Sequence, residues 1–277
     1  MDFEAVKNLR VLLVGDAIMD EYIYVHCHGK AVKENALASS MRGREVFRGG
    51  VWAAAAHVRN FVRHVDVMTG NTIMWNSRMV DDVYMRKLFV THEARKHEEE
   101  QPFFDIENYD LVIVCDFGHG AINKELRGIL EDKAKFLAVN TQTNSINYGF
   151  NVITKYDRAD YVVVDELEAR LAAQDNESPI EEVIGHIGFV NLVVTQGTHG
   201  AIGWNGKAFH RAKALTDHAI DTMGAGDAFF VVSALFAATY HPMPDLLKIG
   251  NAAGAAKVGI IGHRQSVDRE LLEKYLG

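Results

Sequence analysis

Cysteine, proline and long apolar runs are scarce in this sequence of 277 residues. The two cysteines, Cys27 and Cys115, have no CxxC spacing, which excludes a disulfide framework and favours a reducing cytoplasm. Four prolines and no low-complexity tract leave no sign of an interdomain linker. Acidic residues come early and the first apolar run is short, so we expect neither a signal peptide nor a membrane span.

An excess of positive charge is also missing. The chain has 29 lysines and arginines against 37 acidic residues, a formal net charge of -8. This balance argues against a general nucleic-acid binder, which would present a basic face, but it permits a local basic pocket for a phosphorylated small molecule. A hydrophobic content of 48% is ordinary for a globular protein, and the length suits one large α/β domain or two small ones.

Short apolar strands alternate with helical segments along most of the chain. This pattern predicts an α/β fold with a mostly parallel sheet and helices on both faces. Ligands of such sheets bind beyond the carboxyl ends of the strands. Here those ends carry polar residues, namely Asp16, Asp116, Asn140, Asp165 and Thr195.

Two segments near the N-terminus are different, because they alternate only in part and carry charge. EYIYVHCHG (21–29) and SSMRGREVFRGG (39–50) suit an exposed antiparallel pair of strands. His26 and His28 would share one face of a strand, but a structural zinc site needs four ligands, so we favour a polar strand. HVDVMTGN (64–71) is expected to form a strand followed by a turn.

The stretch DTMGAGDAFF (221–230) places two glycines and an alanine before an apolar helix. Backbone N–H groups at such a helix start, with the positive end of the helix dipole, favour an anion. Asp227 in the first turn would then accept a proton from a hydroxyl that attacks a phosphorus atom. The alternative is a plain helix start in which Asp227 only interacts with the dipole.

DTMGAGD resembles the second signature of the PfkB family of ribokinase-like carbohydrate kinases, and RGGVWAAAAH (48–57) partly resembles the first. Further segments follow in the order of the family, namely VGDAIMD (14–20), DFGHG (116–120), DELE (165–168), TQGTHG (195–200) and NAAGAA (251–256). The resemblance implies a ribokinase-like three-layer α/β/α domain with a mostly parallel central sheet and a small β lid. Residues 1–277 would form this single domain, with 21–48 and part of 73–92 as the lid.

The resemblance also implies roles for individual residues. Asp227 would be the catalytic base, and the N–H groups of Gly224, Ala225 and Gly226 would form an anion hole. The substrate-binding residues would be Asp16, Asp20, Gly49, Gly50, His57 and Asp116. ATP would lie against Thr195, Gly197, Gly200, Thr222 and Asn251, while Asp165 and Glu168 would organise Mg²⁺, chiefly through water.

Within the family, GDAIMDEY, DFGHGA and NTQTN (140–144) look most like kinases of heptose 7-phosphate, which act in ADP-heptose synthesis. The implied reaction is phosphorylation of D-glycero-D-manno-heptose 7-phosphate at position 1. Alternatives are another small alcohol (a ketose phosphate, ribose or a nucleoside) and a non-catalytic sugar- or nucleotide-binding regulator. We expect a homodimer through the unpaired lid edges, and a separate nucleotidyltransferase as a functional partner.

Some positions depart from the family pattern, and others allow either contact with a ligand or a purely structural role. Ala53 replaces an asparagine, Asp165 replaces the asparagine of Asn-x-x-Glu, and the short segment 70–78 indicates a trimmed element. Basic residues that would suit a sugar phosphate, or only a solvated strand face, are Arg42, Arg44, Arg48, Arg78, Arg86 and Lys87. Those that would touch a ligand, or only satisfy a turn, are Thr141, Thr143 and Asn144.

Overall fold

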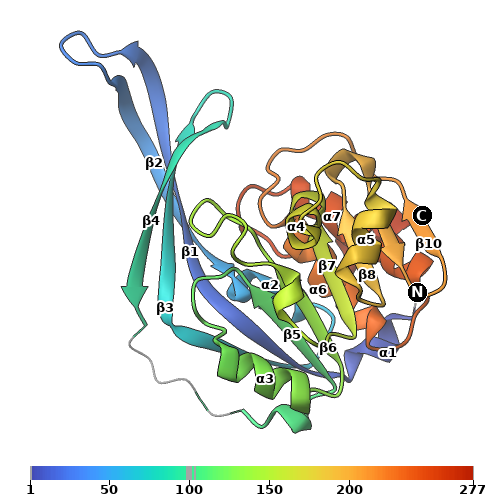
Figure 1. Ribbon diagram of the computed structural model, residues 1–277. Coiled ribbons are helices and arrows are strands. Elements are labelled where there is room, and N and C mark those ends of the chain that lie inside the picture. The colour runs from blue at the N-terminus through green and yellow to red at the C-terminus, as the bar shows by residue number, and fades with distance from the viewer. Residues whose placement is uncertain (1, 98–101, 103, 277) are drawn as a thin grey trace.

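The computed structural model describes residues 2–97, 102 and 104–276. In this part of the chain, one ten-stranded sheet runs through the molecule in the order β10-β9-β8-β7-β6-β5-β1-β3-β4, with β2 paired to β1 (Figure 1). The strands are β1 (Arg10–Lys30), β2 (Leu37–Gly50), β3 (His64–Asp81), β4 (Lys87–Lys96), β5 (Leu111–Asp116), β6 (Leu137–Thr141), β7 (Tyr161–Asp165), β8 (Leu192–Thr195), β9 (Ala201–Trp204) and β10 (Phe209–Ala212).

The centre of the sheet is parallel. All neighbouring pairs from β3 through β1, β5, β6 and β7 to β8 run in the same direction. The pairs at the two sides, including β1 with β2, are antiparallel. The mostly parallel sheet predicted from the sequence is therefore confirmed, and the carboxyl ends of its central strands meet at one edge.

Helices cover both faces of the sheet, because alternate residues of each central strand are apolar on both sides. Val11 and Leu13 of β1 pack with helices α1, α2, α6, α7 and α8, whereas Leu12 and Val14 pack with α3, α4 and α5. The helices are α1 (Phe3–Lys7), α2 (Val51–Val58), α3 (Lys124–Lys133), α4 (Glu166–Ala173), α5 (Ile180–Ile187), α6 (Ala225–Ala237), α7 (Met243–Val258) and α8 (Arg269–Leu276). Short 3₁₀ helices are η1 (Ile106–Asn108), η2 (Ile153–Lys155) and η3 (Gly197–His199).

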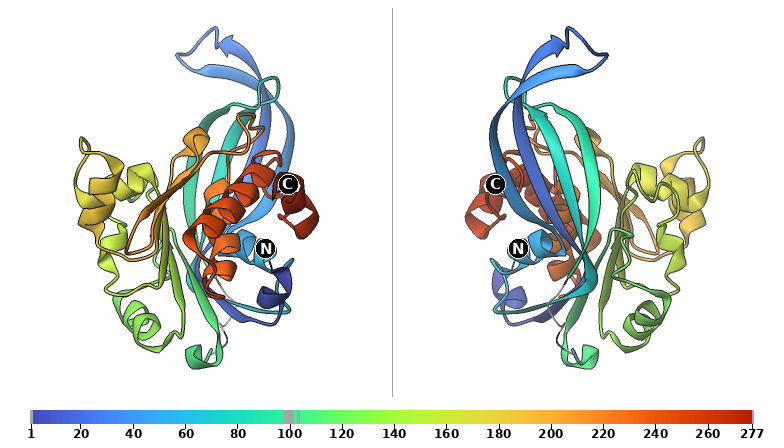
Figure 2. Two further views of the ribbon diagram at one scale, coloured as in Figure 1. Left: turned by 90° about the vertical axis from the view of Figure 1, so that its right-hand side faces the viewer. Right: turned by 90° about the vertical axis from the view of Figure 1, so that its left-hand side faces the viewer.

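The outer parts of β1 and β3 leave this three-layer body and continue as a projecting sheet with β2 and β4. We define the projecting sheet by residues 21–30, 37–48, 73–81 and 87–96. Figure 2 shows it rising beyond the helical layers in both views. β1 and β2 form the antiparallel pair predicted from the sequence, with Glu21 opposite Val46 and Tyr24 opposite Gly43.

The turn expected after residues 64–71 was wrong. β3 continues through Gly70 into the projecting sheet, and only its register with β1 shifts, between Gly15 and Ala17. The glycine serves close packing instead, since a Cβ at position 70 would lie 2.7 Å from the Ala121 Cα. No helix interrupts the chain between Gly70 and Arg78, so the short segment noted in the sequence is a stretch of continuous strand.

Across residues 2–97, 102 and 104–276, no helix has both the length and the apolar character needed to cross a membrane.

We predict that Gly70→Ala lowers the free energy of unfolding by about 1–3 kcal/mol, because the new methyl group would collide with backbone rather than with a mobile side-chain end. Gly43→Ala is the matched control, since a Cβ there would meet only the Tyr24 ring, at 3.9 Å. Urea unfolding of both variants would check this. Equal stability of the two variants would contradict the close packing at Gly70.

Candidate active site

Helix α6 begins directly after Gly224, whose φ of 71° lies in the left-handed region. No side chain caps the start of this helix in the described structure. A Cβ added at Gly226 would meet nothing within 4 Å, so the approach to the first turn is open. An uncapped, accessible helix N-terminus is suited to an anion. The helix start predicted from the sequence is confirmed, with Asp227 in the first turn.

Asp227 is half-buried and accepts a hydrogen bond from the Gln142 side chain at the end of β6. Burial raises the pKa of Asp227, while the nearby charge of His263 and the hydrogen bond from Gln142 act in the opposite direction. The result is a pKa above the ordinary aspartate value. A carboxylate with increased proton affinity is better suited to accept a proton from a hydroxyl group.

The residues on either side of Gln142 are threonines with buried hydroxyl groups. Thr141 Oγ1 and Thr143 Oγ1 are buried and, within the described residues, accept or donate no hydrogen bond. Asn144, in contrast, donates to the Phe117 carbonyl oxygen at 2.8 Å and so stabilises the local turn. The sequence singled out both threonines and Asn144 but not Gln142, because nothing local shows that β6 ends beside α6.

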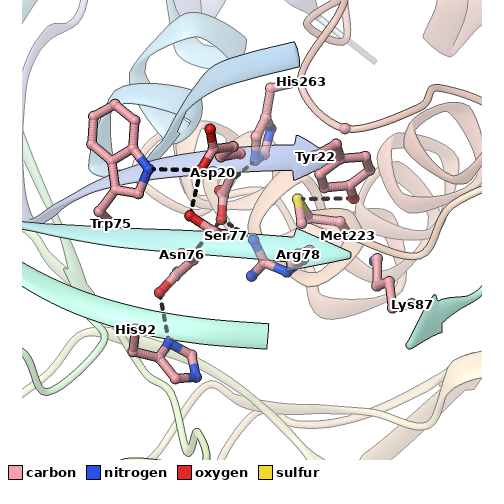
Figure 3. Close-up of polar contacts among 12 residues, drawn as sticks. Asp20, Tyr22, Trp75, Asn76, Ser77, Arg78, Lys87, His92, Met223 and His263 are labelled. Atoms are coloured by element: carbon pink, nitrogen blue, oxygen red, sulfur yellow. Dashed lines mark hydrogen bonds and ion pairs between the residues drawn. The ribbon is translucent and has the colours of Figure 1, made fainter. Parts of the chain in front are cut away.

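Asp20 lies at the base of the projecting sheet and is 4% exposed (Figure 3). It forms an ion pair with Arg78, and His263 Nε2 lies 3.5 Å from its Oδ2. Burial alone would raise the pKa of Asp20, but the hydrogen bond from His263 and the charge of Arg78 outweigh burial and lower the pKa. Gly49 packs against this carboxylate, since a Cβ there would lie 2.1 Å from Oδ2.

Neighbouring residues of β3 contribute to opposite faces of the projecting sheet (Figure 3). Asn76 shares the Asp20 face and contacts His92 Nδ1 through its Oδ1 at 2.7 Å. Trp75 Nε1 donates to Glu21 at 3.2 Å on the other face, and Ser77 donates to the same carboxylate. Asp20, Asn76 and His92 therefore form one polar row that the sequence pattern alone did not reveal.

Asp16 is buried, and its carboxylate holds the loop after β5. Its two oxygens accept backbone N–H groups of Phe117, His119 and Ala121 at 2.9, 3.2 and 2.8 Å. Gly50 packs closely against the backbone of Asp16, because a Cβ at position 50 would lie 2.5 Å from the Asp16 carbonyl oxygen. These contacts give Asp16 a role in positioning the loop, and its contact with a substrate stays a prediction.

Asp116, at the end of β5, is 2% exposed and is engaged in a similar way. Its Oδ2 accepts a hydrogen bond from the Tyr156 hydroxyl at 2.6 Å and pairs with Lys155 at the same distance. Its Oδ1 accepts the Gly118 N–H at 3.1 Å. The structure thus places Asp116 beside the Asp16 loop, and its predicted substrate contact is untested.

His57 lies on the helix after Gly50, as expected, but its contacts are with the protein itself. It is 1% exposed in α2, and its Nδ1 accepts the Val267 N–H at 2.8 Å. Burial lowers its pKa to about 3, with a further contribution from the charges of His263 and Lys257. A buried, neutral ring has almost no surface with which to contact a substrate, so these contacts favour a role in packing α2 against the C-terminal segment, and the predicted substrate contact is untested.

A cleft of about 380 Å³ lies at the carboxyl ends of β7 and β8. Pockets for small organic ligands measure roughly 300–1,000 Å³. The cleft is bordered by Ala225 and Gly226 of the helix start. It also brings together all the residues predicted to bind nucleotide, namely Thr195, Gly197, Gly200, Thr222 and Asn251.

Two of these residues shape the cleft wall. Asn251 is buried, and its Nδ2 donates to the carbonyl oxygens of Ala212 and Lys213 at 3.3 and 3.0 Å. Gly200 has φ of 91°, and a Cβ there would lie 2.0 Å from the Ala212 oxygen. Asn251 therefore fixes the chain beyond β10 against α7, and Gly200 lets the loop before β9 approach the same chain closely, which explains in physical terms why asparagine and glycine occur at these positions.

Asp165 and Glu168 form a capping box at the start of α4. The Asp165 side chain accepts the Glu168 N–H at 2.7 Å, and Glu168 accepts the Asp165 N–H at 2.8 Å. Burial and the charge of Asp165 raise the pKa of Glu168 to about 8. Residues 2–97, 102 and 104–276 hold no cluster of three or more metal-ligating side chains. Mg²⁺ keeps several of its waters when it is bound. The two carboxylates therefore fit a largely hydrated ion, although burial makes a negative charge on Glu168 unfavourable when no cation is near.

Asp221 connects the projecting sheet to the turn before α6. Its Oδ2 accepts the Tyr22 hydroxyl at 2.7 Å and the Gly262 N–H at 2.9 Å. Its Oδ1 accepts the Met223 N–H at 3.1 Å and pairs with Lys87 at 3.0 Å. One buried carboxylate therefore joins β1, β4, the turn and the chain beyond α7. The sequence left Lys87 either to a sugar phosphate or to a solvated strand face, and in the structure it forms this ion pair with Asp221.

A family model described as pfkB family carbohydrate kinase matches residues 87–269, which is more than half of the chain. This chain belongs to the pfkB family of carbohydrate kinases. The family membership makes it a phosphotransferase, and the matched range includes the α6 turn, Asp227 and the whole cleft at β7 and β8.

Solved structures with the same fold support the ribokinase-like architecture. Ribokinase from Thermotoga maritima is 17% identical, with a TM-score of 0.71 and coverage of 97% of this chain and 99% of that chain. Ribokinase from Arabidopsis thaliana, complexed with ribose and ATP, is 15% identical, with a TM-score of 0.70 and coverage of 97% and 99%. A Burkholderia thailandensis nucleoside kinase, in complex with inosine, is 15% identical, with a TM-score of 0.67 and coverage of 96% of both chains.

We predict that Asp221→Asn lowers the free energy of unfolding by about 3 kcal/mol near pH 7, because Lys87 loses its buried partner. Burial alone would raise the pKa of Asp221, but hydrogen bonds from Tyr22 and the Gly262 N–H help to lower it below 3.8. The contribution is therefore complete above the unfolded pKa and disappears as the pH falls toward the folded value.

The difference in the free energy of unfolding between wild type and Asp221→Asn should accordingly become smaller below about pH 4. Denaturant unfolding at a series of pH values would measure it. Asp217→Asn is the control, since this side chain is 85% exposed only four residues away. A difference that stays the same at acid and neutral pH would contradict the stabilising role of the ionised carboxylate.

Proposed function

We propose that this chain transfers the γ-phosphoryl group of ATP to a hydroxyl group of a sugar or sugar phosphate, with Mg²⁺. The observation that carries the proposal is the position of Asp227 between two sites. On one side, Ala225 and Gly226 border the cleft at β7 and β8. On the other side, Asp20 and His263 are close enough to act on the pKa of Asp227.

In this reaction Asp227 accepts the proton of the attacking hydroxyl group, and its raised pKa favours that transfer. The hydrogen bond from Gln142 fixes one carboxylate oxygen and so orients the other. The N–H groups of Gly224, Ala225 and Gly226 at the start of α6 stabilise the charge that develops on the transferred phosphoryl group. Phosphoryl transfer requires little else of a protein beyond positioning.

The substrate lies in this proposal against the polar row at the base of the projecting sheet. Asp20 stays ionised because its pKa is lowered, so its carboxylate can accept hydrogen bonds from sugar hydroxyl groups. The tight approach of Gly49 leaves the backbone close to that carboxylate. The projecting sheet would then act as a lid over the substrate.

ATP lies in the cleft at β7 and β8, as the ATP complex of the Arabidopsis ribokinase makes reasonable for this fold. Mg²⁺, when bound, neutralises phosphate charge, and Asp165 and Glu168 would hold it, chiefly through water. Their capping box fixes both carboxylates at the start of α4.

The preferred substrate is D-glycero-D-manno-heptose 7-phosphate, phosphorylated at position 1. The support is that the three segments resembling heptose 7-phosphate kinases form one network. Asp16 holds the loop at Phe117, and Asn144 and Asn147 both donate to the Phe117 carbonyl oxygen at 2.8 Å. A nucleotidyltransferase that uses the heptose phosphate product would be the functional partner. Ribose, a nucleoside or a ketose phosphate is the alternative acceptor at the same site.

We predict that Asp227→Asn lowers turnover by about 1,000-fold with little change in nucleotide binding, because only the proton acceptor is lost. ADP release from MgATP would be measured with heptose 7-phosphate, sedoheptulose 7-phosphate, fructose 6-phosphate, ribose and adenosine. Asp132→Asn is the control, since Asp132 is exposed on α3, away from both sites.

Turnover with heptose 7-phosphate alone would support the preferred substrate, and turnover with another compound would replace it. If no compound gave turnover above Asp227→Asn, while one raised the melting temperature together with nucleotide, the catalytic proposal would fail in favour of a binding role.

A homodimer through the projecting sheet is part of the same proposal. β2 and β4 leave unpaired edges, and every residue of β4 is exposed. Large apolar side chains with high exposure gather there, including Leu37, Met41, Phe89 and Val90. Exposed strand edges with apolar side chains favour pairing with a second copy.

We predict that Phe89→Glu converts the dimer into a monomer, because a charge would have to be buried at the shared edge. Light scattering after gel filtration would report the mass. Val190→Glu is the control, since Val190 has a similar exposure, 53% against 55% for Phe89, but precedes β8, which pairs with β7 and β9 and not with any strand of the projecting sheet. A monomeric wild type would rule the dimer out.

A further inference from the structure

Lys257 lies one residue before the end of α7 and is completely buried, with 0% of its surface exposed. Lysine is almost never fully buried unless its charge has partners. The proposed reaction does not use this residue, and the sequence analysis did not single it out.

The ammonium group of Lys257 is surrounded by backbone carbonyl oxygens. Its Nζ donates to the oxygens of Met223 and Gly262, both at 2.7 Å, and to that of Ile260 at 3.4 Å. The protonated amine has three N–H groups, one for each of these acceptors, and no lone pair that would face a carbonyl oxygen. Burial lowers the pKa of Lys257, while the carboxylates of Asp221 and Asp227 act in the opposite direction.

These carbonyl groups come from two segments that meet behind the anion-binding turn. Met223 immediately precedes Gly224, and a Cβ added at Gly224 would lie 3.4 Å from the Lys257 Cε. Ile260 and Gly262 belong to the chain that follows α7. The lysine thus joins the turn before α6 to this chain, and places a positive charge directly behind the turn.

A ring of backbone carbonyl oxygens is the environment in which proteins hold monovalent cations such as K⁺. We propose that the Lys257 ammonium group is a tethered cation that fills such a site and orients the turn before α6. Lys257 is then a positioning residue for phosphoryl transfer, a role that rests on the proposed function. The wild-type protein accordingly needs no added monovalent metal ion.

The test compares Lys257→Ala with Lys257→Met in buffers whose only monovalent cation is tetramethylammonium, K⁺ or NH₄⁺. Without a small cation, both variants should lose about 100-fold in turnover, the effect of disturbing one transition-state donor. K⁺ or NH₄⁺ should restore the alanine variant, which leaves room for an ion, but not the methionine variant, which fills the space. Lys248→Ala is the control, since Lys248 is exposed on the same helix.

Melting temperature gives a second readout that needs no turnover. K⁺ should raise it for Lys257→Ala, relative to tetramethylammonium, and leave it unchanged for wild type and Lys257→Met. If wild type shows no kinase activity, only the proposed function fails, and the melting temperatures still test whether Lys257 fills a cation site. A wild type that requires K⁺, or a Lys257→Ala protein that responds to no small cation in either readout, would overturn the tethered cation.

Discussion

The carboxylate of Asp221 is the contact on which the arrangement of the site depends. It contacts the side chains of Tyr22 on β1 and Lys87 on β4, and the backbone N–H groups of Met223 and Gly262. These groups belong to segments that are remote in sequence. Because a buried carboxylate is unfavourable unless its oxygens are satisfied, the four partners must stay together for the fold to tolerate it. The geometry of the turn before α6 follows from that requirement.

Much of the body of the fold could be predicted, because its signals are local. Central parallel strands are continuous apolar runs, and the helix at α6 follows a glycine-rich turn. The residues expected at the nucleotide gather in one cleft, since the carboxyl ends of neighbouring parallel strands necessarily meet at one edge. The expected turn at Gly70 failed because a glycine required for close packing has the same sequence signature as a turn glycine.

The rest of the site could not be predicted, because it depends on contacts between distant segments. Gln142 and His263 lie beside Asp227 only after β6 and the C-terminal chain have packed against α6. The sequence does not distinguish a His57 that binds a sugar from one that accepts the Val267 N–H, because the residue type is the same in both cases. Lys257 is indistinguishable in sequence from a solvated lysine at a helix end, where cations are ordinarily favourable.

The continuity of β1 limits how the projecting sheet can move. A single strand of 21 residues runs from the core to the tip, and β3 accompanies it with one register shift near Gly15. No loop separates the two parts of either strand, so the sheet cannot swing as a rigid panel. Any closing motion is elastic: bending and twist are shared among many interstrand hydrogen bonds, and amplitude grows with distance from the core. Asp20, at the root of the sheet, is therefore held nearly stationary while the tip travels.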